Sequence, residues 1–377
     1  MTAHVAAGDA TDVLLDERPA RTDDPHESID AIGIARRLVD SRLDVFFADR
    51  HLDVPEAPGA IDILRSAIRT MHDAGGKRLR PAFVVWGHVA AGGELDAGVV
   101  DAAAATELLH DFALLHDDVM DRSMMRRGLP AAHVTLRAEH PSGDDHWFGI
   151  SAAVLAGDLA FVWADQLLDG LDSIGLAAGR ARRARAVFTT MRTEVIAGQF
   201  LDLQLGTVPA ATEDDVARIA LLKSARYTVT RPLQIGATLA GADDDLCDRL
   251  AEYGDAVGIA FQLRDDVLGL FGEPERTGKS CADDLREGKR NLLTLCALRR
   301  TGASGRRVLI AALGAPDVDQ ATVDRCREVV AASGALSEVE AVIGAQLDRA
   351  LALSGTFDER ATAALRQLAR DAARRES

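Results

Sequence analysis

Apolar residues recur along most of the chain with the period of an α-helix. In "IDAIGIARRLVDSRLDVFFADRHL" and "AAAATELLHDFALLHDDVMD" they fall at i, i+3, i+4 and i+7, which places them on one face of a helix. Proline, glycine and aspartate cluster between such stretches, as in "DVPEAPGA" and "GTVPAATEDD", and several clusters end in residues that favour helix N-caps. Segments that alternate between polar and apolar residues, as half-buried strands do, are absent. The pattern predicts an all-α protein with about a dozen helices.

The pattern also predicts where the folded part begins. Residues 1–27 are polar and acidic without a sustained period, which predicts a disordered N-terminal tail. Residues 28–377 are expected to form one domain, a large helical bundle. The chain has 377 residues, of which 47% are hydrophobic, so it can bury a substantial core.

Net charge and cysteine content narrow the range of partners and locations. The formal charge of −16 argues against nonspecific binding to nucleic acid or anionic lipid, because both are polyanions. No apolar run reaches the roughly 18 residues that span a bilayer, and the N-terminus lacks the pattern of a secretion signal, so no membrane span is expected. Cys247, Cys281, Cys296 and Cys326 have neither zinc-site nor disulfide-framework spacing. They are expected to be buried, inert thiols in a soluble, cytoplasmic protein.

Three aspartates stand out in "LLHDFALLHDDVMDRSMMRRG", residues 108–128. Asp117, Asp118 and Asp121 lie deep in a helical pattern, where acids lower stability unless something binds them. Asp117 and Asp121 are one turn apart and can converge on one point, while Asp118 projects to the adjoining side. Oxygen ligands without a histidine or cysteine partner favour Mg²⁺ completed by water and phosphate. His110 lies on nearly the same stripe, although a single helical histidine is more often structural.

A short aspartate motif is a weak signal by itself, and the chain contains a second match. "DDLCD", residues 244–248, follows a turn and precedes an apolar-periodic segment, so its acids are expected to cap a helix. Asp265 and Asp266 in "GIAFQLRDDVLGLFG" differ, because they interrupt an apolar helix. Gly269 stands where a third acid would follow. If the helices of the two pairs face one cavity, five acids require about two or three cations; the alternative is two unrelated solvated acidic patches.

Basic residues favour the cation-binding interpretation. "GGKRLRP" places Lys77 and Arg80 at i and i+3 after a Gly-Gly turn, and Pro81 indicates entry into a helix. Arg126 and Arg127 in "RRG" follow Asp121 by about one to two helical turns. Further candidates are Lys223, Lys279 and Lys289, each of which would be a solvated surface residue if taken alone. Together, in so acidic a chain, these cations predict a substrate with at least one diphosphate.

In this order the motifs resemble those of the trans-prenyl diphosphate synthases, which have the all-α isoprenoid synthase fold. The motifs are "GGKRLRP", "ELLHDFALLHDDVMD", "RRGLPAAH", "LAGDLAF", "GQFLDLQ", "KSA" and "FQLRDD", followed by "GK" and "EGKR". They span about two-thirds of the ordered chain, and their order is far more specific than any one of them. The resemblance implies a bundle around a central cavity and a homodimer. It further implies head-to-tail condensation of isopentenyl diphosphate with dimethylallyl, geranyl or farnesyl diphosphate.

The resemblance also implies roles for individual residues. Asp117, Asp118 and Asp121 would bind Mg²⁺ that bridges the allylic diphosphate, and Asp265 and Asp266 would bind a further Mg²⁺ from the opposite side. Isopentenyl diphosphate would be held by Lys77, Arg80, His110 and Arg127, and the allylic diphosphate by Arg126, Lys223, Lys279 and Lys289. Gln262 and Ser224 would lie near the developing cation. Gln199 and Asp202 match the family's "GQxxD" segment, in which Asp202 would support the site without touching the substrate.

This inventory is sufficient for the implied reaction. Metal ions and cationic side chains neutralise the departing diphosphate, so the allylic C–O bond ionises to a carbocation without a protein nucleophile. The double bond of isopentenyl diphosphate attacks that cation, and a proton is then lost. Positioning and exclusion of water supply the rest of the acceleration.

Product length is expected to depend on residues just before the first aspartate motif. In this family an aromatic residue at the fifth position before the first aspartate, with no insertion in the motif, resembles the geranylgeranyl type. Phe112 occupies that position and the neighbouring Ala113 is small. Farnesyl and geranylfarnesyl products are the alternatives, and so is plain core packing for Phe112. Asp111 stands where a small residue is commoner, and it would either perturb His110 or face solvent.

Two other classes share parts of this pattern. A terpene cyclase has the same fold and metal chemistry but needs no second diphosphate site, and "GGKRLRP" and "RRG" argue against it. An aromatic content of only 4% also disfavours a cyclase, because aromatic faces steady long-lived cations. A noncatalytic subunit of a heteromeric synthase would lack some of the aspartates or lysines, and nearly all are present.

Overall fold

The computed structural model describes residues 30–49, 54, 56–57, 59–143, 145–172, 177–207, 211–272 and 281–375, and these are almost entirely helical. The all-α prediction is confirmed, whereas the predicted tail at residues 1–27 lies outside the described residues. In chain order the elements are α2 (Ala31–Ala48), α3 (Ala60–Asp73), α4 (Leu79–Ala90), α5 (Ala97–Met120), β1 (Met125–Arg126), β2 (Leu129–Pro130), α6 (Ala132–Thr135), the 3₁₀ helix η2 (Leu136–Glu139), α7 (His146–Asp169), the 3₁₀ helix η3 (Gly170–Asp172), α8 (Ala178–Thr207), α9 (Glu213–Ile219), the π-helix η4 (Ala220–Thr230), α10 (Arg231–Ala240), α11 (Asp244–Phe271), α13 (Asp283–Arg286), α14 (Leu292–Arg300), α15 (Ala303–Ala312), α16 (Gln320–Ser333), α17 (Ala335–Ser354) and α18 (Glu359–Ala373).

These elements form two compact units. The first contains the described residues up to Arg185 together with Ile235–Ala242, and the second contains Ala186–Gln234 together with the described residues from Asp243 onward. The chain passes between the units inside α8 and α10. The expected single domain around a central cavity stays a prediction.

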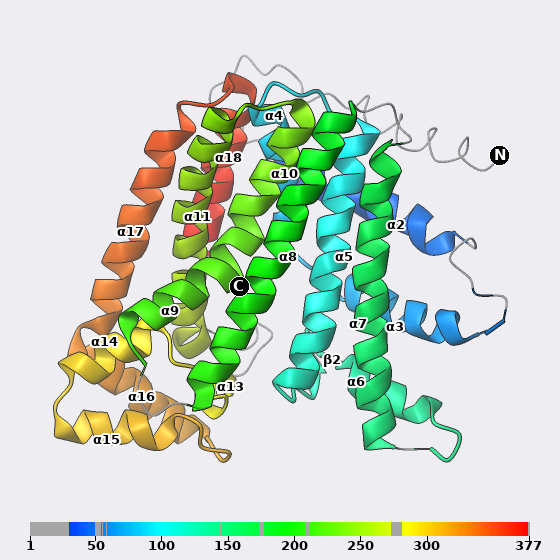
Figure 1. Cartoon of the computed structure of the whole chain (residues 1–377). Helices are drawn as coiled ribbons and strands as arrows, with labels where there is room; N and C mark the ends of the chain where they lie inside the picture. Colours follow the sequence, from blue (N-terminus) through cyan, green and yellow to red (C-terminus); the bar gives the residue numbers. More distant parts are fainter. Residues whose placement is uncertain are drawn as a thin grey trace. The chain divides into compact units, whose positions relative to one another are not determined.

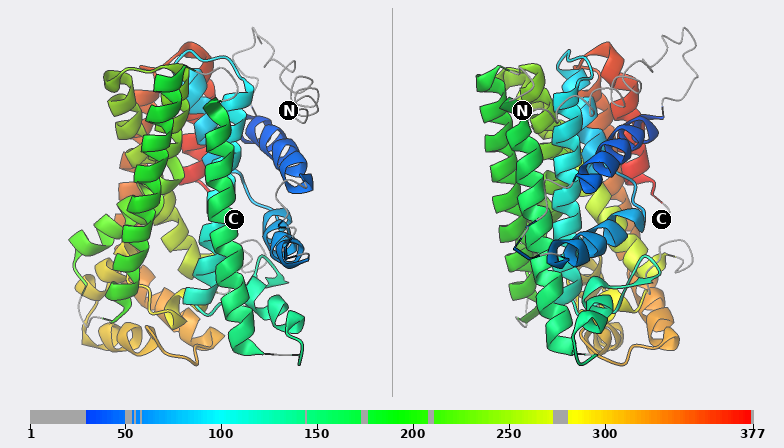
Figure 2. Two further views of the ribbon diagram at one scale, coloured as in Figure 1. Left: turned by 45° about the vertical axis from the view of Figure 1, so that its right-hand side comes forward. Right: turned by 90° about the vertical axis from the view of Figure 1, so that its right-hand side faces the viewer.

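In the first unit, α5 and α7 run side by side and make the most extensive helix pair (Figure 1). The first half of α5 consists largely of alanine, and Ala102 to Ala105 are fully buried. Small side chains let neighbouring backbones approach closely, which suits a helix surrounded by others. α4 packs beside α5, and Figure 2 shows α2 and α3 lying across this group of helices.

In the second unit, α11 is the central helix and packs against η4, α17 and α18. Glycines allow its closest approach to η4: a Cβ added at Gly258 would lie 2.4 Å from Ala225 Cα, and one at Gly254 would lie 2.7 Å from Thr230 Cα. The fully buried Tyr253 donates its hydroxyl to the backbone oxygen of Leu365 at 2.6 Å, which ties α11 to α18. α11 therefore cannot shift along η4 or α18 without breaking these contacts.

Two sequence predictions about individual residue types are confirmed. The "DDLCD" segment begins α11, as predicted, with Asp244 and Asp245 in the first turn, where they favour the helix dipole; the N-cap itself is the preceding Asp243, which accepts a hydrogen bond from Leu246 N. The four cysteines are free and buried. Burial raises the pKa of the Cys296 thiol to about 11, so it is not a reactive thiolate at neutral pH.

α7 is the one described helix that is long and apolar enough to cross a membrane, judged by length and composition. Of its apolar window, 44% is buried inside the protein, where the helix contacts α3, α5 and α6. Such burial is typical of the core helix of a globular protein. The expectation that the chain has no membrane span stays a prediction.

The close approach of α10 to α4 gives a test of this packing. A Cβ added at Gly236 would lie 1.9 Å from the backbone oxygen of Val84, which cannot move aside without distorting α4. We expect Gly236→Ala to lower the free energy of unfolding by about 2 kcal/mol or more, through strain in a packed core. The matched control is Gly344→Ala in α17, where an added Cβ meets nothing within 4 Å. That variant should be neutral or stabilised by up to about 1 kcal/mol. Equal urea unfolding midpoints for the two variants would contradict the close α4–α10 contact.

Candidate active site

The first aspartate motif lies at the carboxyl end of α5. Asp96 caps the other end of the helix by accepting a hydrogen bond from Val99 N, and Asp121 is the C-terminal cap. Asp118 is 1% exposed, whereas Asp117 and Asp121 are half-buried. Asp118 accepts hydrogen bonds on Oδ1 from Arg126, including one from Nε at 2.8 Å. Its other oxygen, Oδ2, is buried without a hydrogen-bond partner. A buried carboxylate oxygen in that state is suited to a cation.

The segment after α5 differs from the sequence prediction. Arg126 and Arg127 were expected about one to two helical turns beyond Asp121, but α5 ends at Met120 and the arginines belong to a short hairpin. β1 and β2 pair antiparallel, with Arg127 (φ 51°) and Gly128 (φ 78°) at the turn. Positive φ at both turn residues is the requirement of a type I′ hairpin. The hairpin folds the chain back, and for that reason Arg126 reaches Asp118.

The hairpin and the start of α4 bring cations around His110. Burial and the positive charges of Arg80, Arg127 and Arg126 hold the pKa of His110 well below its usual value, so the ring is neutral at pH 7. α4 begins at Leu79 directly after the "GGKR" turn, so the predicted helix entry at this motif is confirmed. A neutral imidazole among guanidiniums can donate a hydrogen bond to an anion without adding to their mutual repulsion.

Asp111 does not face solvent, which was one of the two roles expected from the sequence. It is 1% exposed and lies 3.2 Å, Oδ2 to Nδ1, from His72 of α3. Burial raises the pKa of Asp111 to about 6. Burial also opposes a charge on His72, but the hydrogen bonds with Asp111 and Asp40 outweigh it and raise the pKa of His72 to about 9. Asp111 is thus part of a buried ionic group and does not face solvent.

Phe112 forms an aromatic group between α5 and α7. Its ring centroid lies 4.7 Å from that of His116 and 5.0 Å from that of Phe161, both in edge-to-face geometry. Gly157 leaves room for His116, because a Cβ there would lie 2.3 Å from the imidazole. Phe161 was not predicted from the sequence, since nothing in its local pattern distinguishes it from core packing. Phe112 lies five residues, or about one and a half helical turns, before Asp117, whereas His116 directly precedes Asp117.

In the second unit, two predicted residues lie on the π-helix η4. Lys223 Nζ donates to Asp202 Oδ2 of α8 at 2.5 Å, and the supporting role expected for Asp202 stays a prediction. A Cβ at Gly198 would lie 2.6 Å from Lys223 N, so glycine allows α8 to approach the lysine backbone. Ser224 Oγ donates to Gln262 of α11. π-helical turns occur often at functional sites. Because such a turn is wider than that of an α-helix, consecutive side chains point in other directions than they would from an α-helix.

The second aspartate pair is surrounded by other carboxylates. Gln262 Nε2 donates to Asp266 Oδ1 at 2.8 Å, and Arg375 Nη1 donates to Asp265 Oδ1 at 2.5 Å. Burial and the negative charges of Asp284 and Asp265 hold the pKa of Asp266 well above its usual value. When carboxylates are crowded in this way, ionisation of all of them is unfavourable unless a cation binds among them.

Asp284 explains the glycine in the second motif. A Cβ added at Gly269 would lie 1.9 Å from Asp284 Oδ2, so the carboxylate of α13 fills the space that a side chain at position 269 would need. Lys289 Nζ contacts Asp284 at 3.2 Å and Glu287 at 2.6 Å. Asp266, Gly269, Asp284 and Lys289 line one small pocket. Asp284 was not predicted from the sequence, although it lies in "CADDLREGK", a few residues before the predicted Lys289.

Lys77, Lys279 and Gln199 complete the predicted set. Lys77 is exposed on the turn before α4, and Gln199 lies in α8 next to the glycine that faces Lys223. Lys279 lies outside the described residues. The structure brings the remaining candidates into two groups, one around the end of α5 in the first unit and one along η4, α11 and α13 in the second.

This protein is almost purely helical and carries two groups of carboxylates and a basic turn. With these features it belongs to the class of all-α isoprenoid synthases. Comparison with known proteins identifies the family: residues 61–330 match the family model described as polyprenyl synthetase, and the chain belongs to that family. It is a trans-prenyltransferase that makes prenyl diphosphates, which confirms the expectation from its motifs.

Individual relatives agree with this assignment. The chain is 37% identical over 237 residues to geranylgeranyl diphosphate synthase of Methanosarcina mazei, covering 63% of this chain and 68% of that one. It is 34% identical over 290 residues to geranylfarnesyl diphosphate synthase of Aeropyrum pernix, covering 77% and 86%. Among solved structures it resembles geranylgeranyl pyrophosphate synthase of Corynebacterium glutamicum in complex with isoprenyl diphosphate and magnesium. That match has a TM-score of 0.83 and 37% identity and covers 92% of this chain and 100% of the other.

Proposed function

We propose that this protein condenses isopentenyl diphosphate with an allylic diphosphate to make geranylgeranyl diphosphate. The observation that carries the product length is the contact of Phe112 with His116 and Phe161, since Phe112 lies five residues, or about one and a half helical turns, before Asp117. Bulk at that depth limits how far an isoprenoid tail anchored at the aspartates can extend. The similarity to the Methanosarcina mazei and Corynebacterium glutamicum synthases favours the same product, whereas the Aeropyrum pernix relative keeps a geranylfarnesyl product as the alternative.

We further propose that Mg²⁺ binds both carboxylate groups. The buried, unpartnered Oδ2 of Asp118 and the crowded carboxylates of Asp266, Asp265 and Asp284 are oxygen donors that suit this ion. Asp117 and Asp121 would complete the first group. When bound, magnesium supplies positive charge that stabilises the leaving diphosphate. Two or three ions would serve the two groups.

The side chains of each group would then have separate tasks. The guanidiniums of Arg80 and Arg127 and the neutral imidazole of His110 would hold isopentenyl diphosphate, with Lys77 on the preceding turn. Arg126, Lys223 and Lys289 would bind the allylic diphosphate, with Lys279 added from outside the described residues. Gln262 and Ser224, hydrogen-bonded to each other, present oxygen atoms that can steady an adjacent carbocation. No residue is required as a covalent nucleophile.

Two properties beyond the reaction are also proposed. The first is a homodimer, supported by large apolar side chains that are exposed on single helices: Leu155 and Val162 on α7, and Ile196 and Phe200 on α8. Exposed apolar stripes of this kind are typical of interfaces. The second is a cytoplasmic location, supported by four buried free thiols.

The reaction itself is tested by incubating the purified protein with radiolabelled isopentenyl diphosphate, Mg²⁺ and each of dimethylallyl, geranyl and farnesyl diphosphate. We expect a labelled twenty-carbon diphosphate with at least one primer. A main product of fifteen or twenty-five carbons would replace the geranylgeranyl assignment by one of its alternatives. No incorporation with any primer would contradict the proposed function.

Replacement of the first aspartate motif tests the metal assignment. We expect Asp117→Ala and Asp121→Ala each to lower kcat at least about 1,000-fold, because several kcal/mol of electrostatic stabilisation of the leaving group are lost. Each variant should also lose the rise in melting temperature that Mg²⁺ and inorganic diphosphate together give the wild type. Asp248→Ala, in the capping "DDLCD" segment, is the matched control and should keep both properties. Near-normal turnover in either motif variant would refute its metal role.

Gly269 gives a test in which aspartate, the residue that the family motif would have at this position, is expected to weaken metal binding. We expect Gly269→Asp to weaken Mg²⁺ binding several-fold, because the new side chain collides with Asp284 and adds a further charge to a crowded group. The double variant Gly269→Asp/Asp284→Ala should regain most of that affinity, because the new aspartate of α11 then takes the place of the Asp284 carboxylate of α13. Calorimetric Mg²⁺ titration in the presence of diphosphate measures both. Tighter binding in the single variant would show that Asp284 does not occupy this position.

Product length is tested at the aromatic group. Phe112→Ala should shift the main product to chains of twenty-five carbons or more, because removal of the ring opens space beside Phe161. Phe188→Leu in α8 removes part of a fully buried ring elsewhere and should change stability without changing the product. Radio-thin-layer chromatography of the dephosphorylated products reads the result. An unchanged distribution for Phe112→Ala would leave Phe112 as ordinary core packing.

A further inference from the structure

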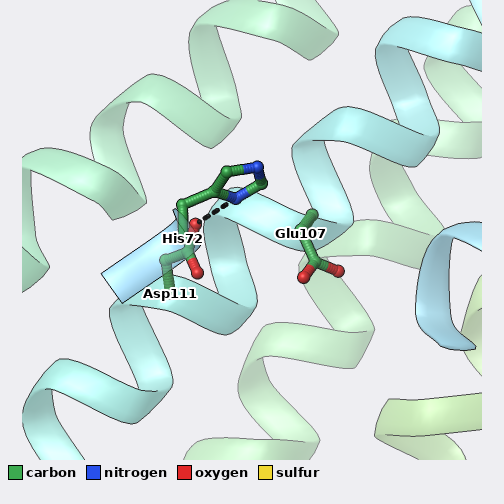
Figure 3. Close-up of side chains that lie close together, drawn as sticks. All are labelled: His72, Glu107 and Asp111. Atoms are coloured by element: carbon green, nitrogen blue, oxygen red, sulfur yellow. Dashed lines mark hydrogen bonds and ion pairs between the residues drawn. The ribbon is translucent and has the colours of Figure 1, made fainter. Parts of the chain in front are cut away.

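A buried ionic group lies beneath the turn that carries Lys77 and Arg80. Its centre is Arg78, which is 6% exposed and is the N-cap residue of α4. Figure 3 shows two acids of α5 next to His72 of α3, with a hydrogen bond joining His72 and Asp111. Glu107 and Asp111, one helical turn apart, are 2% and 1% exposed, and His72 is 3% exposed. All belong to the first unit.

Arg78 joins three other helices through a single guanidinium. Nε donates to Asp40 Oδ1 of α2 at 2.8 Å, and Nη1 donates to Glu107 Oε1 of α5 at 2.8 Å. Nη2 lies 3.0 Å from His72 Nε2 and donates to the backbone oxygen of His72, in the last turn of α3, at 3.2 Å. A planar fork can make these contacts at once, whereas an ammonium group, as a single point, cannot.

The backbone of Arg78 is held in an unfavourable conformation. Its φ is 52°, in the left-handed region that side-chain-bearing residues seldom adopt. Arg127, on the hairpin, has φ 51°. Gly76 brings the two residues together, since a Cβ there would lie 3.0 Å from Arg78 Nη1 and 3.2 Å from Arg127 Nη2. Positive φ persists only where the surroundings impose it, and such positions gather at functional sites.

His72, Glu107 and Asp111 have ligand atoms within 4.8 Å of one another, close enough to hold a metal ion. The guanidinium of Arg78 already contacts His72 and Glu107, and its positive charge compensates the negative charge of the Glu107 and Asp111 carboxylates. A metal would have to displace an ion pair between buried partners. The group is therefore better explained as a fixed structural support than as a metal site.

We propose that Arg78 is a positioning residue for isopentenyl diphosphate: it clamps the turn of Lys77 and Arg80 onto α5, which carries His110. The proposal rests on the proposed function of Lys77 and Arg80. Arg78 does not touch the substrate. Its contacts fix the turn at the distance from α5 at which Arg80 and His110 can bind one diphosphate together.

The acids beneath the turn make this arrangement possible before any substrate binds. Arg78, Arg80 and Arg127 lie close enough to affect the charge of one imidazole, that of His110. Without compensation these cations would repel one another and turn outward. Glu107, Asp111 and Asp40 supply negative charge on the protein side, so the opposite side is left to the diphosphate. Preorganised cations bind without first having to be ordered.

Arg78→Lys tests the clamp at constant charge, because lysine keeps the cation but loses the fork. We expect the KM for isopentenyl diphosphate to rise about ten-fold, because contacts to buried charged partners are lost. The KM for the allylic diphosphate and kcat at saturation should change less than about two-fold. The matched control is Arg42→Lys, since Arg42 pairs with the buried Asp101 on the same two helices, α2 and α5, away from the basic turn. It should leave both KM values unchanged, although it can lower the melting temperature.

Two further variants separate the possible outcomes. Arg80→Ala must raise the KM for isopentenyl diphosphate; if it does not, the proposed role of this turn fails before Arg78 is considered. If Arg80→Ala raises that KM and Arg78→Lys does not, the clamp is overturned while the proposed function stands. Glu107→Gln keeps an oxygen that Arg78 can donate to, and we expect a rise of about three-fold. A fall in KM there would overturn the proposal, because it would mean that Glu107 acts only by repelling the substrate.

The metal alternative is tested with the same proteins. Adding Zn²⁺ or Mn²⁺ without diphosphate should raise the melting temperature of wild type and of His72→Gln equally, or of neither. A rise in wild type that is lost in His72→Gln would overturn the clamp in favour of a metal at this group.

Discussion

Groups of like charge held close together are the constraint that the rest of this structure must satisfy. A site for two diphosphates and their metal ions needs cations and carboxylates in quantities that repel one another in the empty protein. In the first unit, the buried Glu107 of α5 and the half-buried Asp40 of α2 lie behind the guanidinium of Arg78, and Arg126 pairs with Asp118. In the second unit, Arg375 and Lys289 lie beside the carboxylates of α11 and α13. In both units, side chains of opposite charge therefore lie beside these groups and balance part of their charge.

Helix packing keeps these charges at fixed distances. The alanine-rich half of α5 and the glycines of α11 let backbones approach closely, so the polar ends of the helices have little freedom. The hairpin after α5 and the left-handed turn before α4 are the places where the backbone departs from regular geometry. These two segments contain Arg78, Arg126 and Arg127, whose charges affect His110. Backbone strain is most often tolerated at functional positions of this kind.

Sequence patterns predicted the helices well because hydrophobic period and capping residues are local signals. The helix start at "DDLCD" and the helix entry after "GGKR" were correct for that reason, although the cap itself is Asp243, one residue earlier. The hairpin at Arg126 and Arg127 was missed, since a two-residue pairing has no periodicity to detect and its turn places a non-glycine residue at positive φ. Arg78 was not singled out because its partners Asp40 and Glu107 are distant in the chain, and the burial of Asp111 depends on a distant partner as well. Only the folded arrangement shows that His72, 39 residues earlier, makes Asp111 a buried ion rather than a surface one.

The pairing of Gly269 with Asp284 has a consequence for reading such families. A motif search that counts aspartates along one helix would score this chain as lacking a ligand, yet a carboxylate is present at nearly the same point in space. That carboxylate lies 15 residues further along the chain, on α13 instead of α11. Negative charge at this point is therefore a property of the folded chain that a count of residues along one helix does not measure.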